Sequence, residues 1–89
     1  MSKINLEVLA EELYSHLRSN RVHAGVEATY DGLIEVEITW GDWKHDHLRC
    51  KWLAKEFFES KGLTSLVGSR ITEEDGSDCY SAIHKFLVA

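Results

Sequence analysis

Positive charge is scarce in this 89-residue chain, which has 10 lysines and arginines against 15 aspartates and glutamates. The formal net charge is therefore −5. Binding to nucleic acid or to an anionic membrane surface depends on clustered positive charge, so this balance argues against both. We expect neither nucleic acid nor a membrane among the partners.

Long apolar runs and paired cysteines are also missing. No stretch approaches the roughly 18 apolar residues that span a bilayer, and the first residues turn polar at once, unlike a secretory signal. The two cysteines, Cys50 and Cys79, have no CxxC spacing and are typical of reduced thiols rather than of a disulfide framework. These features predict a cytoplasmic protein.

Common catalytic motifs do not occur, because the chain has no GxSxG elbow, no GxxxxGK[ST] loop and no GxGxxG loop. A cysteine with a nearby histidine, Cys50 with His47 or Cys79 with His84, remains an alternative. A small buried thiol, and a core histidine satisfied by one hydrogen bond, are the commoner explanations. We expect a protein that is not an enzyme and uses no cofactor.

The chain nevertheless has the apolar mass for a packed interior, with 44% hydrophobic residues and three each of Trp, Tyr and Phe. Its length suits one domain, residues 1–89. Apolar residues at helical spacing predict an amphipathic helix over residues 5–19, capped by Asn5. The apolar stripe of this helix consists of Leu6, Leu9, Ala10, Leu13 and Leu17.

Residues 22–40 alternate with a period of two and predict a hairpin. A two-residue turn at 31–32 would divide the apolar residues between the two faces of the sheet. A three-residue loop at 30–32, with its glycine left-handed, instead places Val26 opposite Val36 and all the apolar residues on one face.

Asp42 can cap a second helix that runs to about Lys61, with Gly62 as its left-handed C′ residue. A second hairpin follows, with strands at 66–72 and 77–88 and a turn at residues 74–76. The predicted fold is α+β in the order α-β-β-α-β-β, a four-stranded, mainly antiparallel sheet with both helices on one face. Apolar positions repeat at an offset of 44 residues, which an internal αββ duplication and shared patterning explain equally well.

The segment His45–Cys50 is rich in potential metal ligands. His45 and His47 are two residues apart on a helix and point about 200° away from each other, so they cannot share an ion. Only His47 or Asp46 could share a face with Cys50, and further ligands would have to come from elsewhere. We therefore expect no metal site.

Three carboxylates gather on the outer face of the first hairpin, where Glu27 lies opposite Glu35 and Glu37 follows two residues later. The triplet is either a solvated face or a docking patch for a basic partner. Removing the like-charge pair with Glu35→Lys is expected to raise stability.

Two apolar patches also lack an obvious cover. Leu48 and Trp52 project from the second helix on the side away from its apolar arc. On the outer face of the second hairpin we expect an apolar strip, which an oligomer would cover, unless the face assignment is inverted and the strip is core. The strip consists of Val67, Ile71, Cys79, Ile83 and Leu87.

These features predict a small non-enzymatic protein–protein interaction module that self-associates into a homo-oligomer. They also predict an acidic docking face for a protein partner, for which a basic protein is one candidate. The alternative is a small enzyme or metal-dependent protein that uses the segment His45–Cys50 together with His23 or His84. The predicted binding residues are Glu27, Glu35, Glu37, Leu48, Trp52, Ile71 and Ile83.

Overall fold

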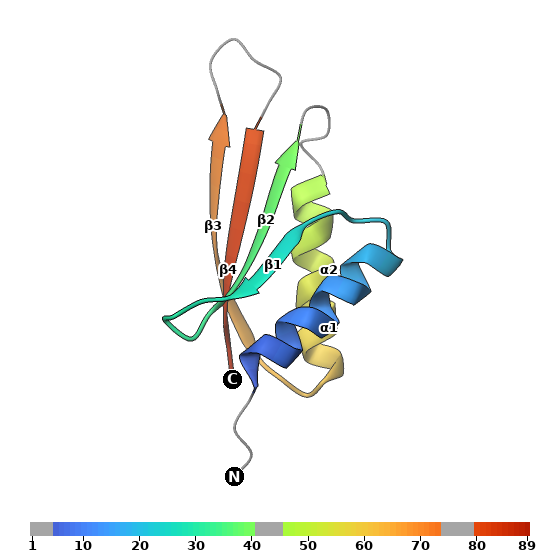
Figure 1. Ribbon diagram of the computed structural model, residues 1–89, viewed down its shortest axis with the longest axis vertical. Coiled ribbons are helices and arrows are strands. Elements are labelled where there is room, and N and C mark those ends of the chain that lie inside the picture. The colour runs from blue at the N-terminus through green and yellow to red at the C-terminus, as the bar shows by residue number, and fades with distance from the viewer. Residues whose placement is uncertain (1–4, 41–45, 74–79) are drawn as a thin grey trace.

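The computed structural model describes residues 5–40, 46–73 and 80–89. Two helices lie against one face of a four-stranded sheet, and among the described residues no helix lies on the other face (Figure 1). The predicted α+β class and element order are confirmed. The elements are α1 (Leu6–Ser19), β1 (Gly25–Ala28), β2 (Ile34–Trp40), α2 (Asp46–Ser60), β3 (Ser65–Glu73) and β4 (Tyr80–Val88).

Helix α1 begins as predicted, because the Asn5 side chain accepts a hydrogen bond from the backbone N–H of Val8 at 3.2 Å. Its end is a Schellman motif, in which Val22 N–H donates to the carbonyl of Leu17 at 2.9 Å. The left-handed residue of this motif is Arg21, with φ 63°, where glycine is the usual choice. The helix therefore ends in a favourable motif formed by an unfavourable residue.

The first hairpin has the predicted register, with Val26 opposite Val36 and Glu27 opposite Glu35. A backbone hydrogen bond from Thr29 N–H to the carbonyl of Leu33, 2.8 Å long, closes the three-residue loop. Gly32 lies in the left-handed region with φ 81°, as the loop requires. The alternation of apolar and polar residues was sufficient to predict this register.

Helix α2 also ends in a Schellman motif, in which Gly62 has φ 74° and Leu63 N–H donates to the carbonyl of Phe58 at 3.0 Å. The predicted C′ role of Gly62 is confirmed. The predicted cap, Asp42, lies outside the described residues.

The strands form the order β1-β2-β4-β3, with every neighbouring pair antiparallel. The second strands of the two hairpins are central, and β1 and β3 are the edges. The two αββ units thus occupy equivalent places in the sheet, as either explanation of the repeat would give. The core between sheet and helices consists of Leu9, Leu13, Leu17, Val22, Ile34, Val36, Ile38, Cys50, Ala54, Phe57, Phe58, Phe86 and Val88.

The second hairpin corrects one prediction. Ile83 and Leu87 of β4 face outward as expected. The residues that alternate with them along the strand are buried against the helices, namely Ala82, His84 and Phe86. The predicted strip is nevertheless wrong for β3. Its two β3 members are paired with residues of the buried row, Val67 with Phe86 and Ile71 with Ala82, and so lie on the helix side.

The error comes from the connection between the strands. A three-residue turn at 74–76 would pair residue 73 with residue 77, whereas the sheet pairs Glu73 with Tyr80. The difference is an odd number of residues, and an odd shift exchanges the two faces of a strand. The outward residues of β3 are therefore Leu66, Gly68, Arg70 and Thr72. Cys79, the remaining member of the predicted strip, lies outside the described residues.

Candidate binding surface

The surface of the sheet that no helix covers, called here the open face, has a distinct distribution of charge. Its residues come from all four strands, and the register of each pair of strands places them in rows across the sheet. The described residues of the open face are Gly25, Glu27, Glu35, Glu37, Leu66, Gly68, Arg70, Thr72, Ser81, Ile83, Lys85 and Leu87.

The half of the open face on β1 and β2 is acidic. Glu27 and Glu35 are directly opposite each other, and Glu37 is the next outward residue along β2. Cross-strand neighbours on one face lie close enough for like charges to repel. A shallow depression of about 210 Å³ lies among these carboxylates and Gly25. We call Glu27, Glu35 and Glu37 the acidic half.

The half on β4 and β3 is basic. Lys85 pairs with Glu35 on one side and Gly68 on the other, while Arg70 pairs with Ile83. A depression of about 340 Å³ lies among these residues. We call Arg70 and Lys85 the basic half. Sequence reasoning missed it, because only the sheet order brings these cations beside the acidic strands.

Apolar residues occupy the centre and one end of the open face. Ile83, half-buried, lies between Glu37 and Arg70 in its row. Leu66 and Leu87 are opposite each other, with 73% and 50% of their surfaces exposed. The open face therefore combines charges of both signs with exposed apolar area.

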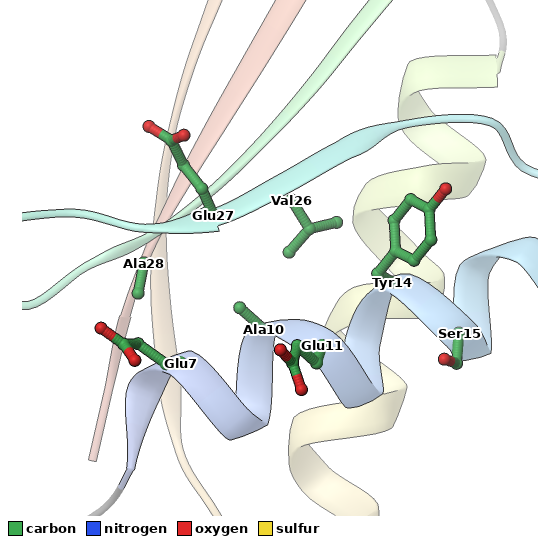
Figure 2. Close-up of a pocket in the computed structure, with 8 residues that line it drawn as sticks. All are labelled: Glu7, Ala10, Glu11, Tyr14, Ser15, Val26, Glu27 and Ala28. Atoms are coloured by element: carbon green, nitrogen blue, oxygen red, sulfur yellow. The ribbon is translucent and has the colours of Figure 1, made fainter.

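A groove of about 560 Å³ runs between α1 and the edge strand β1 (Figure 2). Val26 and Ala28 point from the strand toward α1, Val26 above Ala10 and Ala28 near Glu7 (Figure 2). Glu11 lies farther along the helix, and Glu27 points away from it (Figure 2). The groove thus extends the acidic half around the edge of the sheet, and its two helix carboxylates were not among the predicted binding residues.

The other predicted residues lie elsewhere on the molecule. Leu48 and Trp52 are 46% and 62% exposed on α2, and the Lys55 ammonium lies 5.5 Å from the centre of the Trp52 ring. Ile71 is half exposed on the helix side of β3. Four of the seven predicted residues, Glu27, Glu35, Glu37 and Ile83, therefore share the open face, and three do not.

A polar cluster that extends from the buried His84 to the exposed Ser69 joins α2, β3 and β4. The Nε2 atom of His84 lies 3.0 Å from the carbonyl oxygen of His47, and its Nδ1 lies 2.7 Å from Ser69 Oγ. A carbonyl can only accept, so Nε2 carries the hydrogen and Nδ1 accepts from the Ser69 hydroxyl. His84 is a core histidine, as predicted, although it has two hydrogen bonds rather than one.

The His84 imidazole is poorly suited to act as a base for Ser69. The ring is fully buried, and burial lowers its pKa from 6.5, with the nearby His47 and Lys51 adding to the effect. A lowered pKa weakens proton abstraction from the serine hydroxyl at neutral pH. The cluster fits a structural link between helix and sheet better than a catalytic pair.

Cys50 is similarly unsuited to metal binding or nucleophilic attack. Its side chain is fully buried, and burial raises the pKa of the thiol from 9.0 to about 12. Both functions use the thiolate, which this environment disfavours. Across residues 5–40, 46–73 and 80–89, no group of three or more His, Cys, Asp or Glu side chains is placed to hold a metal ion. His45 lies outside these ranges.

Within the same three ranges, neither helix has the length and apolar character needed to cross a membrane. Comparison of the chain with protein-family models, with curated proteins and with solved structures finds no match.

Proposed function

We propose that this chain is a small protein–protein interaction module that self-associates, and that the open face of its sheet is the binding surface. The observation that carries the proposal is the acidic half: Glu27 and Glu35 directly opposed, with Glu37 beside them, on a face that no helix covers. Inside an isolated monomer the pair of Glu27 and Glu35 is unfavourable by roughly 0.2–1 kcal/mol, although Lys85 of the same chain offsets part of this repulsion at Glu35. A cation supplied by a partner would make it favourable.

The apolar residues of the open face support the same function. One face of an antiparallel sheet can remain in water when its residues are polar. Here Leu66 and Leu87 are largely exposed, and Ile83 lies between charged neighbours. Covering these residues with a partner would remove apolar area from water, while the charges around them would set the partner's orientation.

Sedimentation velocity of the full chain, from about 1 μM to about 1 mM, tests self-association over the affinity range of small interfaces. We expect a concentration-dependent dimer that weakens as salt rises, because exposed charges are screened. A monomer throughout this range would refute the proposal.

Two matched substitutions locate the surface. Ile83→Lys adds a charge at the centre of the open face and should abolish the dimer. Ile71→Lys makes the same chemical change on the same hairpin but on the helix side, and should leave the dimer intact. Circular dichroism of both variants confirms that each is folded. Equal effects of the two substitutions would show that the open face is not the interface.

A further inference from the structure

We infer that two copies of this chain pack their open faces together about a twofold axis parallel to the strands, so that the acidic half of each copy lies on the basic half of the other. The inference rests on the proposed self-association and adds the orientation of the partner. It follows from where the sign of the charge changes on the sheet.

The change of sign falls between the two central strands. Across the sheet from β1 to β3, one row of paired residues carries two carboxylates and then an ammonium group, and the next carries a carboxylate, an apolar residue and a guanidinium group. The rows are Glu27, Glu35, Lys85 and Gly68, and then Gly25, Glu37, Ile83 and Arg70.

A twofold axis between two packed sheets can run along the strands or across them, and the charges distinguish the two. An axis across the strands lays β1 and β2 of one copy on β1 and β2 of the other, which sets carboxylates against carboxylates. An axis along the strands, between β2 and β4, lays each acidic half on the other copy's basic half. Only the second arrangement is electrostatically complementary.

In this arrangement Glu35 of one copy lies over Lys85 of the second copy, and the reverse contact is made on the other side of the axis, as a self-complementary interface requires. By the same symmetry Ile83, on the central strand β4, lies close to the axis and over Glu37 of the second copy. The twist of each sheet would rotate the strands of the two copies by about 30° without exchanging the halves.

The size of the open face sets the expected affinity. The four strands have 4, 7, 9 and 9 residues, and at about 3.3 Å per residue and about 4.8 Å between strands they give a footprint of roughly 460 Å². A standard interface buries about 800 Å² on each partner. The open face is therefore large enough for a reversible dimer, but small enough that the charged pairs should decide whether it forms.

Charge reversal of each half provides the test. The first variant carries Glu35→Lys and Glu37→Lys, and the second carries Arg70→Glu and Lys85→Glu. Either variant by itself would form a homodimer in which like charges face each other. The dissociation constant of that homodimer should therefore be at least about tenfold higher than that of the natural chain. Mixed in equal amounts, the two variants should form a heterodimer, because the substituted position 35 of one copy then lies over the substituted position 85 of the other with the opposite charge. Sedimentation with one variant fluorescently labelled measures this.

Chemical cross-linking then separates the two axes. Packed sheets lie about 10 Å apart, so a bismaleimide of about that length is used in chains carrying Cys79→Ser. The axis along the strands lays Glu27 of one copy over Gly68 of the second copy, so a mixture of the Glu27→Cys and Gly68→Cys variants should cross-link and each variant alone should not. A cross-link formed by Glu27→Cys alone would show that like halves meet and would overturn the inference. The remaining native thiol, Cys50, is buried.

The outcomes also separate the inference from the proposed function. If the dimer of the natural chain persists when either half is reversed but is abolished by Ile83→Lys, the open face is still the interface and only the orientation is overturned. If it also persists in Ile83→Lys, the protein self-associates through another surface, which overturns the open face as the binding surface together with the orientation. A natural chain that stays monomeric overturns both. If a double reversal unfolds the chain, the single reversals Glu35→Lys and Lys85→Glu, mixed in the same way, repeat the test with a smaller perturbation, because these two positions face each other across the interface.

Discussion

Replacing Glu27 with lysine should stabilise the monomer, whereas the same change at Glu35 should not. Glu27 lies on an edge strand and has one cross-strand neighbour, Glu35. Glu35 lies on a central strand between Glu27 and Lys85. Both positions belong to the same row, so the two substitutions differ chiefly in the neighbours that they meet.

The magnitudes follow from counting these neighbours. Glu27→Lys converts one repulsive pair into an attractive one, and cross-strand pairs contribute roughly 0.2–1 kcal/mol each. Since these side chains are in contact with solvent, we expect a gain of about 0.5 kcal/mol. Glu35→Lys makes the same gain against Glu27 but loses an attraction by facing Lys85. Its net effect should be within about 0.3 kcal/mol of zero. This revises the stabilisation that the sequence pattern predicts for Glu35→Lys.

Urea unfolding at a few micromolar protein, where a weak dimer is dissociated, measures both variants at low and at high salt. The gain from Glu27→Lys should shrink at high salt, because screening weakens the exposed pair. Destabilisation by Glu27→Lys would contradict the register of the first hairpin. A gain from Glu35→Lys equal to that from Glu27→Lys would contradict the pairing of β2 with β4.

Three further predictions concern the rest of the fold. Arg21→Gly should raise the unfolding free energy by about 1 kcal/mol and the melting temperature by roughly 5 °C. The reason is that Arg21 has φ 63°, and glycine adopts that conformation without a steric penalty. An unchanged melting curve would mean that the motif is not strained. His84 should make the fold less stable in acid, because its pKa is lowered in the folded chain. Below pH 6.5 the unfolded chain therefore binds a proton that the folded chain does not. The free energy of unfolding should then fall by up to about 1.4 kcal/mol for each unit that the pH is lowered. His84→Gln should flatten that profile, and Ser69→Ala, which removes the hydroxyl donor to His84, should cost about 1–2 kcal/mol in urea unfolding. In a Cys79→Ser chain, Cys50 should react with thiol reagents only as fast as the protein opens, because burial raises its pKa to about 12; rapid modification of the folded protein would contradict that burial.

Local patterns were sufficient to predict the parts of the fold whose physics is local. The stripe of α1, its Asn5 cap and the left-handed Gly62 each depend on residues within a few positions of one another. The first hairpin belongs to this group, because its strands are joined by three residues and its apolar residues all need the same face.

The second hairpin was beyond such reasoning. Its first strand is an edge, and it carries apolar residues on both faces, Leu66 outward and Val67 and Ile71 inward, so alternation does not select a face. The distance along the chain between Glu73 and Tyr80 then decides the register, and a glycine in the connection does not identify which residues pair across it. The sequence pattern therefore predicts the wrong face for Ile71.

The amino-acid sequence by itself determined the two helices, the first hairpin and the acidic row on it, because each of these follows from spacing along the chain. Only the tertiary structure decided what lies beside that row. By pairing β2 with β4, the sheet brings Lys85 next to Glu35 and sets a basic half against the acidic one. It also brings Ser69 and the His47 carbonyl to the two nitrogens of His84. These contacts join residues 15 to 50 positions apart. At such separations neither periodicity nor turn chemistry specifies which residues meet, because the packing of the whole chain determines it.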